Sequence, residues 1–316
     1  MSKRLGWILA LLATAAYSTN AIIARGAILN GMHPVTLLAG RFLLASGLYV
    51  VTVSSFAAMR SDDPPSAVTR SLDRFSFWIA TLSGVINGLT LVCFFVALRT
   101  VSASIFSMIS ITLVQFFTIG LLALGGESIT VRKSLRLILG LIGLYFLVGL
   151  GGSADSFGLL LIVVGAILFT IHIVSVQWYL KAYDSWTVTT LIVVSATAST
   201  LLLWWLTDAG TFVPWPFGWL AIVFQGVITT FVGRILTYKS IAVIGSGQYA
   251  LLAPLETSLT LLWAMIFLGE RLMSIQWIGA VFILMGISLA IDIVWKSILG
   301  LRISTLLGNP LDSDGS

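Results

Sequence analysis

The sequence predicts an all-α integral membrane protein in which ten transmembrane helices form two inverted repeats of five. Three observations carry this prediction: an apolar composition, ten apolar runs long enough to cross a bilayer, and an internal repeat. Of the 316 residues, 58% are hydrophobic and 9% are charged, whereas soluble domains are roughly 25% charged. So few charged side chains could not cover a soluble globule of this size. A soluble enzyme and a nucleic-acid-binding protein are therefore excluded.

Each predicted span is an apolar run of about 20 residues, the length of helix that crosses a hydrocarbon core about 30 Å thick. In chain order the runs cover residues 5–24, 34–56, 75–98, 102–124, 132–150, 156–180, 186–207, 217–241, 246–268 and 273–295. The first run follows Lys3 and Arg4, and we interpret it as a retained helix because no small-residue cleavage site follows it. The longest connection, residues 57–74, carries several charges and two prolines. The other connections are too short to hold a soluble catalytic domain.

The distribution of basic residues predicts the orientation of the spans. If the N-terminus is cytoplasmic, twelve of the seventeen Lys and Arg residues lie on that side and three lie on the other. Arg41 and Arg234 fall inside spans. Positive charge is retained on the cytoplasmic side during insertion, so both termini are expected in the cytoplasm.

The second half of the chain repeats the first. The dipeptide Gly126-Glu127 after the fourth span recurs as Gly269-Glu270 after the ninth, 143 residues later. Nearer the start of each half the offset is 152 residues, which pairs Tyr17 with Phe169. The longer loop at 57–74 absorbs the difference between the two offsets.

Five helices per repeat is an odd number, so the second copy enters the membrane with the opposite orientation to the first. Inverted repeats of this kind are typical of secondary transporters. We expect a first five-helix repeat at residues 1–150, a second, inverted five-helix repeat at 151–296, and a cytoplasmic C-terminal tail at 297–316.

Three short motifs resemble those of a known family. They are Arg41-Phe42-Leu43-Leu44-Ala45 in the second span, Ala97-Leu98-Arg99 followed by Ser102-Ala103-Ser104 before the fourth, and Leu268-Gly269-Glu270-Arg271-Leu272 after the ninth. Their order and spacing over residues 5–295 resemble the EamA family of the drug/metabolite transporter superfamily. The resemblance implies two inverted five-helix halves around a central cavity that the fifth and tenth helices do not line. It also implies export of amino acids and other small metabolites.

Glu256 is the only acid in the middle of a predicted span. An ionisable group at bilayer depth is costly, so it is a candidate functional residue by default. Pro254 interrupts the helix two residues earlier and frees a backbone carbonyl. Glu256 is a candidate site for a substrate amine or for a proton. The alternatives are an ion pair with Arg41 or Arg234 and a neutral buried acid.

Arg234 is the better candidate to bind a substrate carboxylate, because it lies deep in the eighth span with Thr230 one turn before it on the same face. Arg41 lies nearer a membrane surface. Its guanidinium could face the cavity and bind a carboxylate, or it could extend toward the headgroups.

A second group of candidates places aromatic and hydrogen-bonding side chains near the midplane. Asn20 and His172 are repeat counterparts, and each shares a helix face with an aromatic residue three positions earlier, Tyr17 or Phe169. Asn87 in the third span is a further candidate contact. The serines of the fourth span are interpreted as packing residues, because small side chains allow helices to approach closely.

The predicted function is secondary transport by alternating access, with export of small polar metabolites such as amino acids. No catalytic residue, metal site or cofactor is expected: Cys93 is the single cysteine, and no nucleotide-binding loop is present. The expected partners are a small-molecule substrate, membrane lipid and, as candidate coupling ion, protons; nucleic acid is not expected. We predict a monomer in the cell (inner) membrane. Two alternatives stay open, a membrane sensor or scaffold without transport and an intramembrane enzyme acting on lipid.

Overall fold

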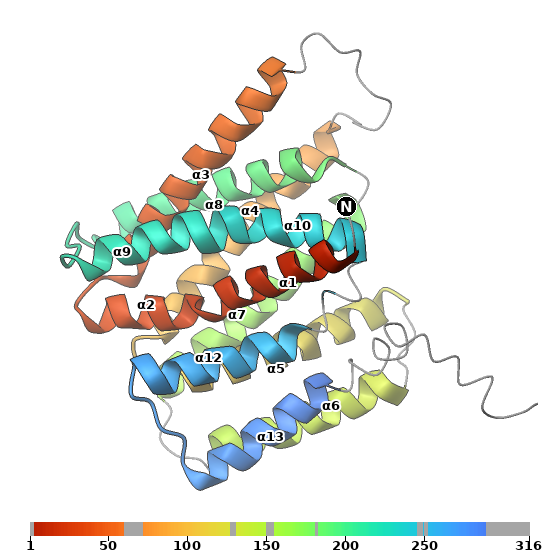
Figure 1. Cartoon of the computed structure of the whole chain (residues 1–316), viewed down its shortest axis with the longest axis vertical. Coiled ribbons are helices and arrows are strands. Elements are labelled where there is room, and N and C mark those ends of the chain that lie inside the picture. The colour runs from red at the N-terminus through yellow and green to blue at the C-terminus, as the bar shows by residue number, and fades with distance from the viewer. Residues whose placement is uncertain are drawn as a thin grey trace, which may run out of the picture.

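A computed structural model of the chain describes residues 3–59, 72–126, 131–149, 155–180, 183–244, 249 and 252–288. Within these ranges helix is the only regular secondary structure, which agrees with the all-α prediction. The helices lie side by side as a bundle (Figure 1). The predicted tail at 297–316 lies outside the described residues.

The helices of the first half begin and end close to the predicted spans. They are α1 (Lys3–Ser18), α2 (Asn20–Leu29), α3 (Pro34–Met59), α4 (Arg74–Ala97), α5 (Ala103–Leu124) and α6 (Val131–Leu144), which continues as the wider π-helical turn η1 (Tyr145–Gly149). The helices of the second half are α7 (Ser156–Ser175) with η2 (Val176–Leu180), α8 (Ser185–Leu206), α9 (Phe217–Val223) with η3 (Phe224–Val232) and α10 (Gly233–Ile244), α12 (Ala253–Phe267) and α13 (Ser274–Ser288).

Seven of the described helices are long and apolar enough to cross a membrane. They correspond to the first four predicted spans and to the sixth, seventh and eighth. The fifth, ninth and tenth spans contain shorter apolar helices, at Leu137–Val148, Leu255–Phe267 and Ser274–Gly286. The ninth and tenth predicted spans extend into residues that the structure does not describe. The membrane-protein class is therefore confirmed, and the number of ten spans stays a prediction.

Acidic and hydroxyl side chains begin four of the helices. Asp73, Ser102, Asp155 and Asp184 each precede a helix and accept a hydrogen bond from a backbone N–H in its first turn. Such caps satisfy donors that have no partner within the helix. Hydrogen bonds to Ser76 and Tyr183 also hold the pKa of the exposed Asp73 carboxyl below its usual value.

The packing of the bundle is symmetric under exchange of the two halves. Helix α4 packs against α7, and their repeat counterparts α10 and α1 also pack against each other. In the same way α5 contacts α7, and its counterpart α12 contacts α1. Each of these contacts joins one half to the other. The two halves therefore form one interdigitated bundle, and any central cavity is bounded by both.

Glycines allow the closest approaches between helices. On α4, Gly84 and Gly88 face the backbone of α8, where an added Cβ at Gly84 would lie 2.5 Å from the Ile192 carbonyl oxygen. On the pair formed by α6 and α13, Gly143 and Gly279 face each other, and a Cβ on either would lie 2.6 Å from the carbonyl oxygen of the other. Small residues four apart are a common device for tight helix packing in membranes.

Replacing Gly143 by alanine is expected to lower the free energy of unfolding by about 1–3 kcal/mol, the usual cost of overpacking a tight interface. The Cβ would press on the Gly279 carbonyl and on Ile283, both parts of the facing helix. The measurement is the thermal unfolding of the detergent-solubilised protein. Gly120→Ala is the matched control, because no atom lies within 4 Å of a Cβ there. Equal unfolding temperatures for the two variants would contradict this packing.

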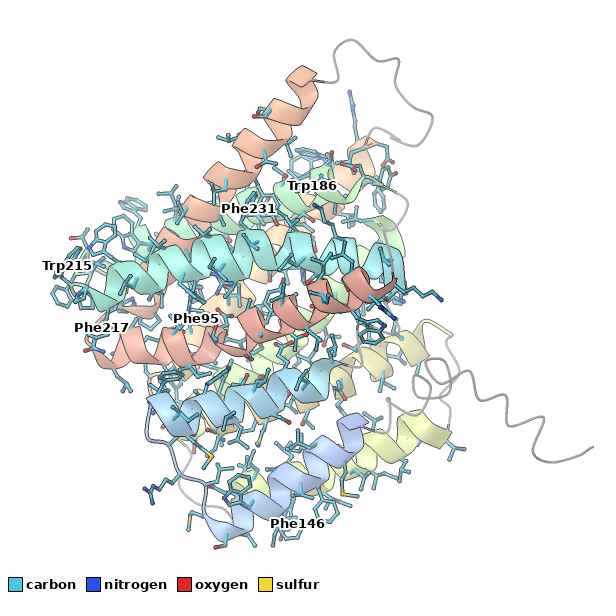
Figure 2. All side chains as sticks on the ribbon, in the orientation of Figure 1. Phe95, Phe146, Trp186, Trp215, Phe217 and Phe231 are labelled. Carbon is cyan, nitrogen blue, oxygen red and sulfur yellow. The ribbon has the colours of Figure 1, made fainter. Side chains whose placement is uncertain are left out.

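Aromatic side chains gather where α9 begins. Trp215 and Phe217 extend from that end of the bundle, whereas Phe95 lies within it (Figure 2). Trp215 is 83% exposed and Phe217 62% exposed, and the Phe95 ring is buried. Exposed aromatic residues at the ends of spans are typical of a membrane–water interface.

Candidate functional site

A cavity of about 260 Å³ lies where helices of the two halves meet. Helices α1, α2, α4 and α5 of the first half and α7 and α12 of the second half supply the lining residues. These residues are Tyr17, Asn20, Ala21, Phe94, Phe106, Ser107, Ser110, Ile111, Val114, Phe169, Glu256, Thr257 and Thr260. Neither α6 nor α13 contributes a lining residue. The volume lies just below the roughly 300–1,000 Å³ of pockets for drug-sized ligands, so it suits a small metabolite.

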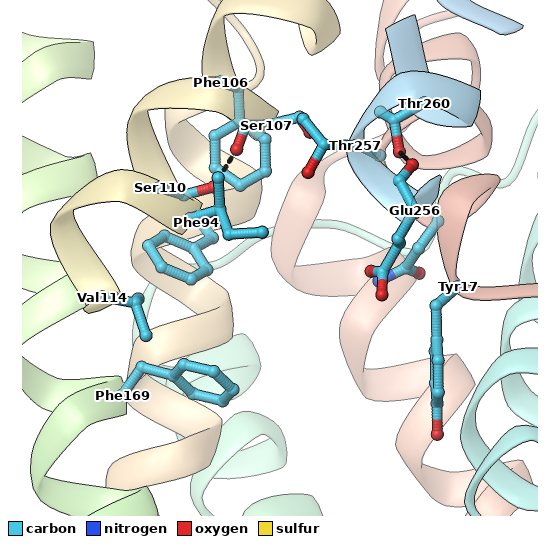
Figure 3. A pocket seen from close by; sticks show the side chains of 13 residues that line it. Tyr17, Phe94, Phe106, Ser107, Ser110, Val114, Phe169, Glu256, Thr257 and Thr260 are labelled. Atoms are coloured by element: carbon cyan, nitrogen blue, oxygen red, sulfur yellow. Dashed lines mark hydrogen bonds between the residues drawn. The ribbon is translucent and has the colours of Figure 1, made fainter. Parts of the chain in front are cut away.

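The two walls of the cavity differ in chemistry. Figure 3 shows Phe94, Phe106 and Phe169 on one wall with Ser110, and Glu256 and Tyr17 on the other. Tyr17 and Phe169 are the counterparts that the 152-residue offset paired. An aromatic wall facing a carboxylate provides cation–π and charge-assisted contacts for one positively charged group.

Most of the hydroxyls in the lining are already used within the bundle. Ser110 donates to the Ser107 carbonyl at 3.2 Å, and Thr257 donates to the Ala253 carbonyl at 3.1 Å. Thr260 donates to the carbonyls of Ser18 and Glu256. The Ser107 hydroxyl has no hydrogen bond with a described residue, so it remains able to bind a ligand.

The carboxylate of Glu256 has neither a hydrogen bond nor an ion pair with any described residue. The predicted alternative of an ion pair with Arg41 or Arg234 is therefore not formed. The residue lies in the first turn of α12, which begins at Ala253, and residues 250 and 251 before it lie outside the described part of the chain. Pro254 is tolerated there, since the missing N–H would have no helical partner in the first turn. The kink that we predicted before Glu256 falls partly outside the described residues.

Arg41 lies behind the cavity and does not extend toward the headgroups. Its side chain is buried, with 6% exposed. The Nε donates to Thr230 Oγ1 at 2.7 Å, and Nη1 donates to Asn20 Oδ1 at 2.9 Å and to Gln225 Oε1 at 3.5 Å. The guanidinium thus joins α2 and α3 of the first half to η3 of the second half.

The two other candidates on the eighth span take different places. Thr230 is buried against Arg41 and does not line the cavity. Arg234 is half-buried on α10 and forms no hydrogen bond or ion pair with a described residue. Its charge nevertheless lies close enough to act on Arg41 and on His172.

His172 and Asn87 belong to a cluster beside the cavity. The His172 Nδ1 lies 2.7 Å from the Ser83 hydroxyl and 3.1 Å from the Ser83 carbonyl. Its ring stacks on Phe169 with a centroid distance of 5.8 Å, so His172 supports a lining residue from behind. Asn87 is fully buried one turn after Ser83, and its Nδ2 has no hydrogen-bond partner among the described residues.

The repeated dipeptide Gly269-Glu270 forms a clamp at the first turn of α5. Gly269 has φ +65° and turns the chain back toward the bundle. The Glu270 carboxylate accepts from the backbone N–H groups of Ala103 and Ser104 at 2.7 and 2.9 Å, and it pairs with Arg25 Nε at 3.1 Å. Arg25 also donates to the carbonyls of Leu98 and Val101.

Of the eight predicted substrate contacts, the structure brings four together in one cavity: Tyr17, Asn20, Phe169 and Glu256. The other four do not line the cavity: His172 stacks on the lining residue Phe169, Thr230 accepts from Arg41 behind the cavity, and Asn87 and Arg234 lie elsewhere in the bundle. Sequence reasoning missed the contributions of Ser107, Ser110, Phe94 and Phe106. The spacing of the two serines, three apart on one helix face, was the available signal.

Larger hollows on the flanks of the bundle have a different character. One of about 830 Å³ lies between α3 and α9 and includes Leu43, Leu48 and Trp219. Its lining is almost wholly apolar, so it suits lipid acyl chains rather than a polar solute. The smaller central cavity is the candidate site because its ionisable and hydrogen-bonding groups converge.

Fold and cavity define a multi-pass helical membrane protein with a polar pocket between two repeated halves. The sequence matches the EamA-like transporter family twice, over residues 4–149 and 156–291. The chain belongs to this family, and thus to the drug/metabolite transporter superfamily, as its motifs predicted.

The comparison with solved structures supports the same fold. Nineteen chains match, and one of them, described only as the crystal structure of a protein, aligns with a TM-score of 0.59 at 17% identity. The alignment covers 92% of this chain and 99% of the other. No curated protein matches the sequence.

Proposed function

We propose that the protein is a secondary transporter that exports small, amine-bearing polar metabolites such as amino acids from the cytoplasm. The observation that carries the proposal is the Glu256 carboxylate, which lines a cavity between the two halves and has no partner among the described residues. A carboxylate at membrane depth is retained for a role. A substrate ammonium group is a fitting partner because the facing aromatic rings also attract cations.

The two-repeat architecture would allow the conformational change that alternating access requires. Ten spans in two inverted halves allow two near-equivalent packings, one open to each side of the membrane. The symmetric contacts of α4 with α7 and of α10 with α1 support this proposal, because both join the halves next to the cavity. The protein would act as a monomer in the cell (inner) membrane with both termini in the cytoplasm.

Protons are the proposed coupling ion. A proton and a substrate ammonium group would compete for the Glu256 carboxylate, so binding of one would release the other. Such competition at one site is sufficient for exchange of substrate against protons, without a second ion site.

Counterflow in proteoliposomes tests this function without knowledge of coupling or direction. Vesicles are loaded with a pool of unlabelled amino acids, and entry of each labelled amino acid is followed. Saturable entry that unlabelled substrate suppresses is the expected result. No counterflow with folded protein would remove amino acids from the proposal, and sugars, nucleosides and organic cations would then be tested.

A further inference from the structure

Arg41 fixes the orientation of the Asn20 side chain. A guanidinium only donates hydrogen bonds, and Arg41 Nη1 lies 2.9 Å from Asn20 Oδ1. The amide oxygen must therefore face Arg41, and the amide nitrogen Nδ2 points away from Arg41. Gln225 Nε2 donates to the Asn20 main-chain carbonyl at 3.0 Å and holds the backbone in place. Asn20 Nδ2 has no hydrogen bond with a described residue, and Asn20 lines the cavity.

The charge of Arg41 is unbalanced at this position. Its hydrogen-bond acceptors are the neutral groups of Asn20, Thr230 and Gln225. The rings of Phe42 and Phe95 also lie close, each 5.7 Å from the guanidinium carbon, and the nearby charge of Arg234 has the same sign. Among the described residues, Arg25 and Glu270 form the ion pair. No described carboxylate therefore balances the charge of Arg41. A buried charge without a counter-ion is costly, and an anionic group nearby would be favoured.

We propose that the Asn20 amide N–H₂ group, oriented and polarised by Arg41, binds the carboxylate of the substrate. This inference rests on the proposed function, in which Glu256 binds the substrate ammonium group. Asn20 on α2 and Glu256 on α12 line the same small cavity, and an amino acid carries both charged groups on one carbon atom. Arg41 is a positioning residue, because it acts on the substrate through Asn20.

This arrangement predicts a substrate class. The transporter selects amino acids over the corresponding primary amines, in which hydrogen replaces the carboxylate. Amines would satisfy Glu256 but would leave Asn20 Nδ2 without an acceptor and the charge of Arg41 without an anion. Hydrogen bonds that involve a charged group contribute enough for a preference of about tenfold to a hundredfold.

The first test is Asn20→Asp. An aspartate keeps an oxygen for Arg41, so the contact between α2 and α3 is preserved, but it removes the N–H₂ donor and adds a negative charge. Counterflow is measured for each of the twenty L-amino acids and for the primary amine that corresponds to each one transported. We expect counterflow of amino acids to fall about tenfold to a hundredfold, while counterflow of the amines is retained or increased.

The second test separates positioning from structural support. Arg41→Met leaves the Asn20 amide free to rotate, so the preference for amino acid over amine should fall about tenfold. Arg41→Lys keeps a donor and the charge, and it should restore part of that preference. A purely structural role would change the transport of both substrates by the same factor. Size-exclusion chromatography of the detergent-solubilised variants reports whether each is folded.

The outcomes distinguish this inference from the function on which it rests. Equal transport of amino acids and amines by the wild-type protein would overturn the carboxylate subsite and leave transport standing. Equal losses for both substrates in Asn20→Asp, or an unchanged preference in Arg41→Met, would also overturn it. No counterflow of any amino acid or amine would overturn both.

Discussion

Replacing Glu256 by glutamine is expected to abolish substrate flux driven by a pH gradient. Glutamine cannot bind and release a proton, so coupling is lost. Its amide oxygen can still accept a hydrogen bond from an ammonium group, so exchange should continue at saturating substrate with a KM raised about tenfold to a hundredfold. The measurement compares pH-driven flux and counterflow in the same proteoliposomes.

A matched acid-to-amide change provides the control. Asp208 is exposed in the loop after α8 and has φ 44°, a conformation that asparagine also adopts readily. Asp208→Asn should leave flux and KM unchanged. If pH-driven flux persists at the wild-type rate in Glu256→Gln, Glu256 does not couple transport to protons.

Replacing Glu270 by alanine is expected to destabilise the protein by about 1.5–3 kcal/mol, the usual contribution of hydrogen bonds to a charged group. The Arg25 and Glu270 side chains are 15% and 12% exposed, so the pair is partly screened by solvent. The change would leave Arg25 without its counter-ion and the first backbone donors of α5 without their cap. Thermal unfolding in detergent measures the effect.

Glu270→Gln gives an intermediate case. Its amide oxygen can cap one backbone N–H of α5, but it carries no charge for Arg25. We expect an unfolding temperature between those of the wild type and of Glu270→Ala. The control Asp208→Asn should unfold at the wild-type temperature. Equal stability of wild type and Glu270→Ala would show that the clamp does not hold α5 to the second half.

The spans were predictable because each depends on local composition. The helix α3 begins at Pro34, where the second span was predicted to begin, and α7 (Ser156–Ser175) begins at the first residue of the sixth. An apolar run of sufficient length determines a membrane helix whatever its neighbours are. The start of α12 was harder to predict, because the sequence is apolar on both sides of Pro254 and no change in hydropathy marks the first residue of the helix.

The cavity lining was predictable where the repeat relates residues and where an ionisable group, Glu256, falls inside a predicted span. The pairing of Tyr17 with Phe169 placed both near the centre, and both line the cavity. The contact of Arg41 with Thr230 could not be predicted, because it joins residues 189 positions apart through packing between the halves. The role of Glu270 could not be predicted either. The repeated Gly-Glu dipeptide drew attention to this residue but did not indicate that it caps α5.

Thiol labelling from each side of the membrane tests whether the central cavity binds substrate and opens to both sides. Cys93, half-buried on α4, is first replaced by alanine, and Ser107→Cys then places one thiol in the cavity lining. Oriented vesicles are treated from either side with a membrane-impermeant thiol reagent. We predict modification from both sides, slowed by a transported amino acid, and no modification of the Cys93→Ala parent. Modification from one side only, at a rate that no transported substrate changes, would contradict alternating access through this cavity.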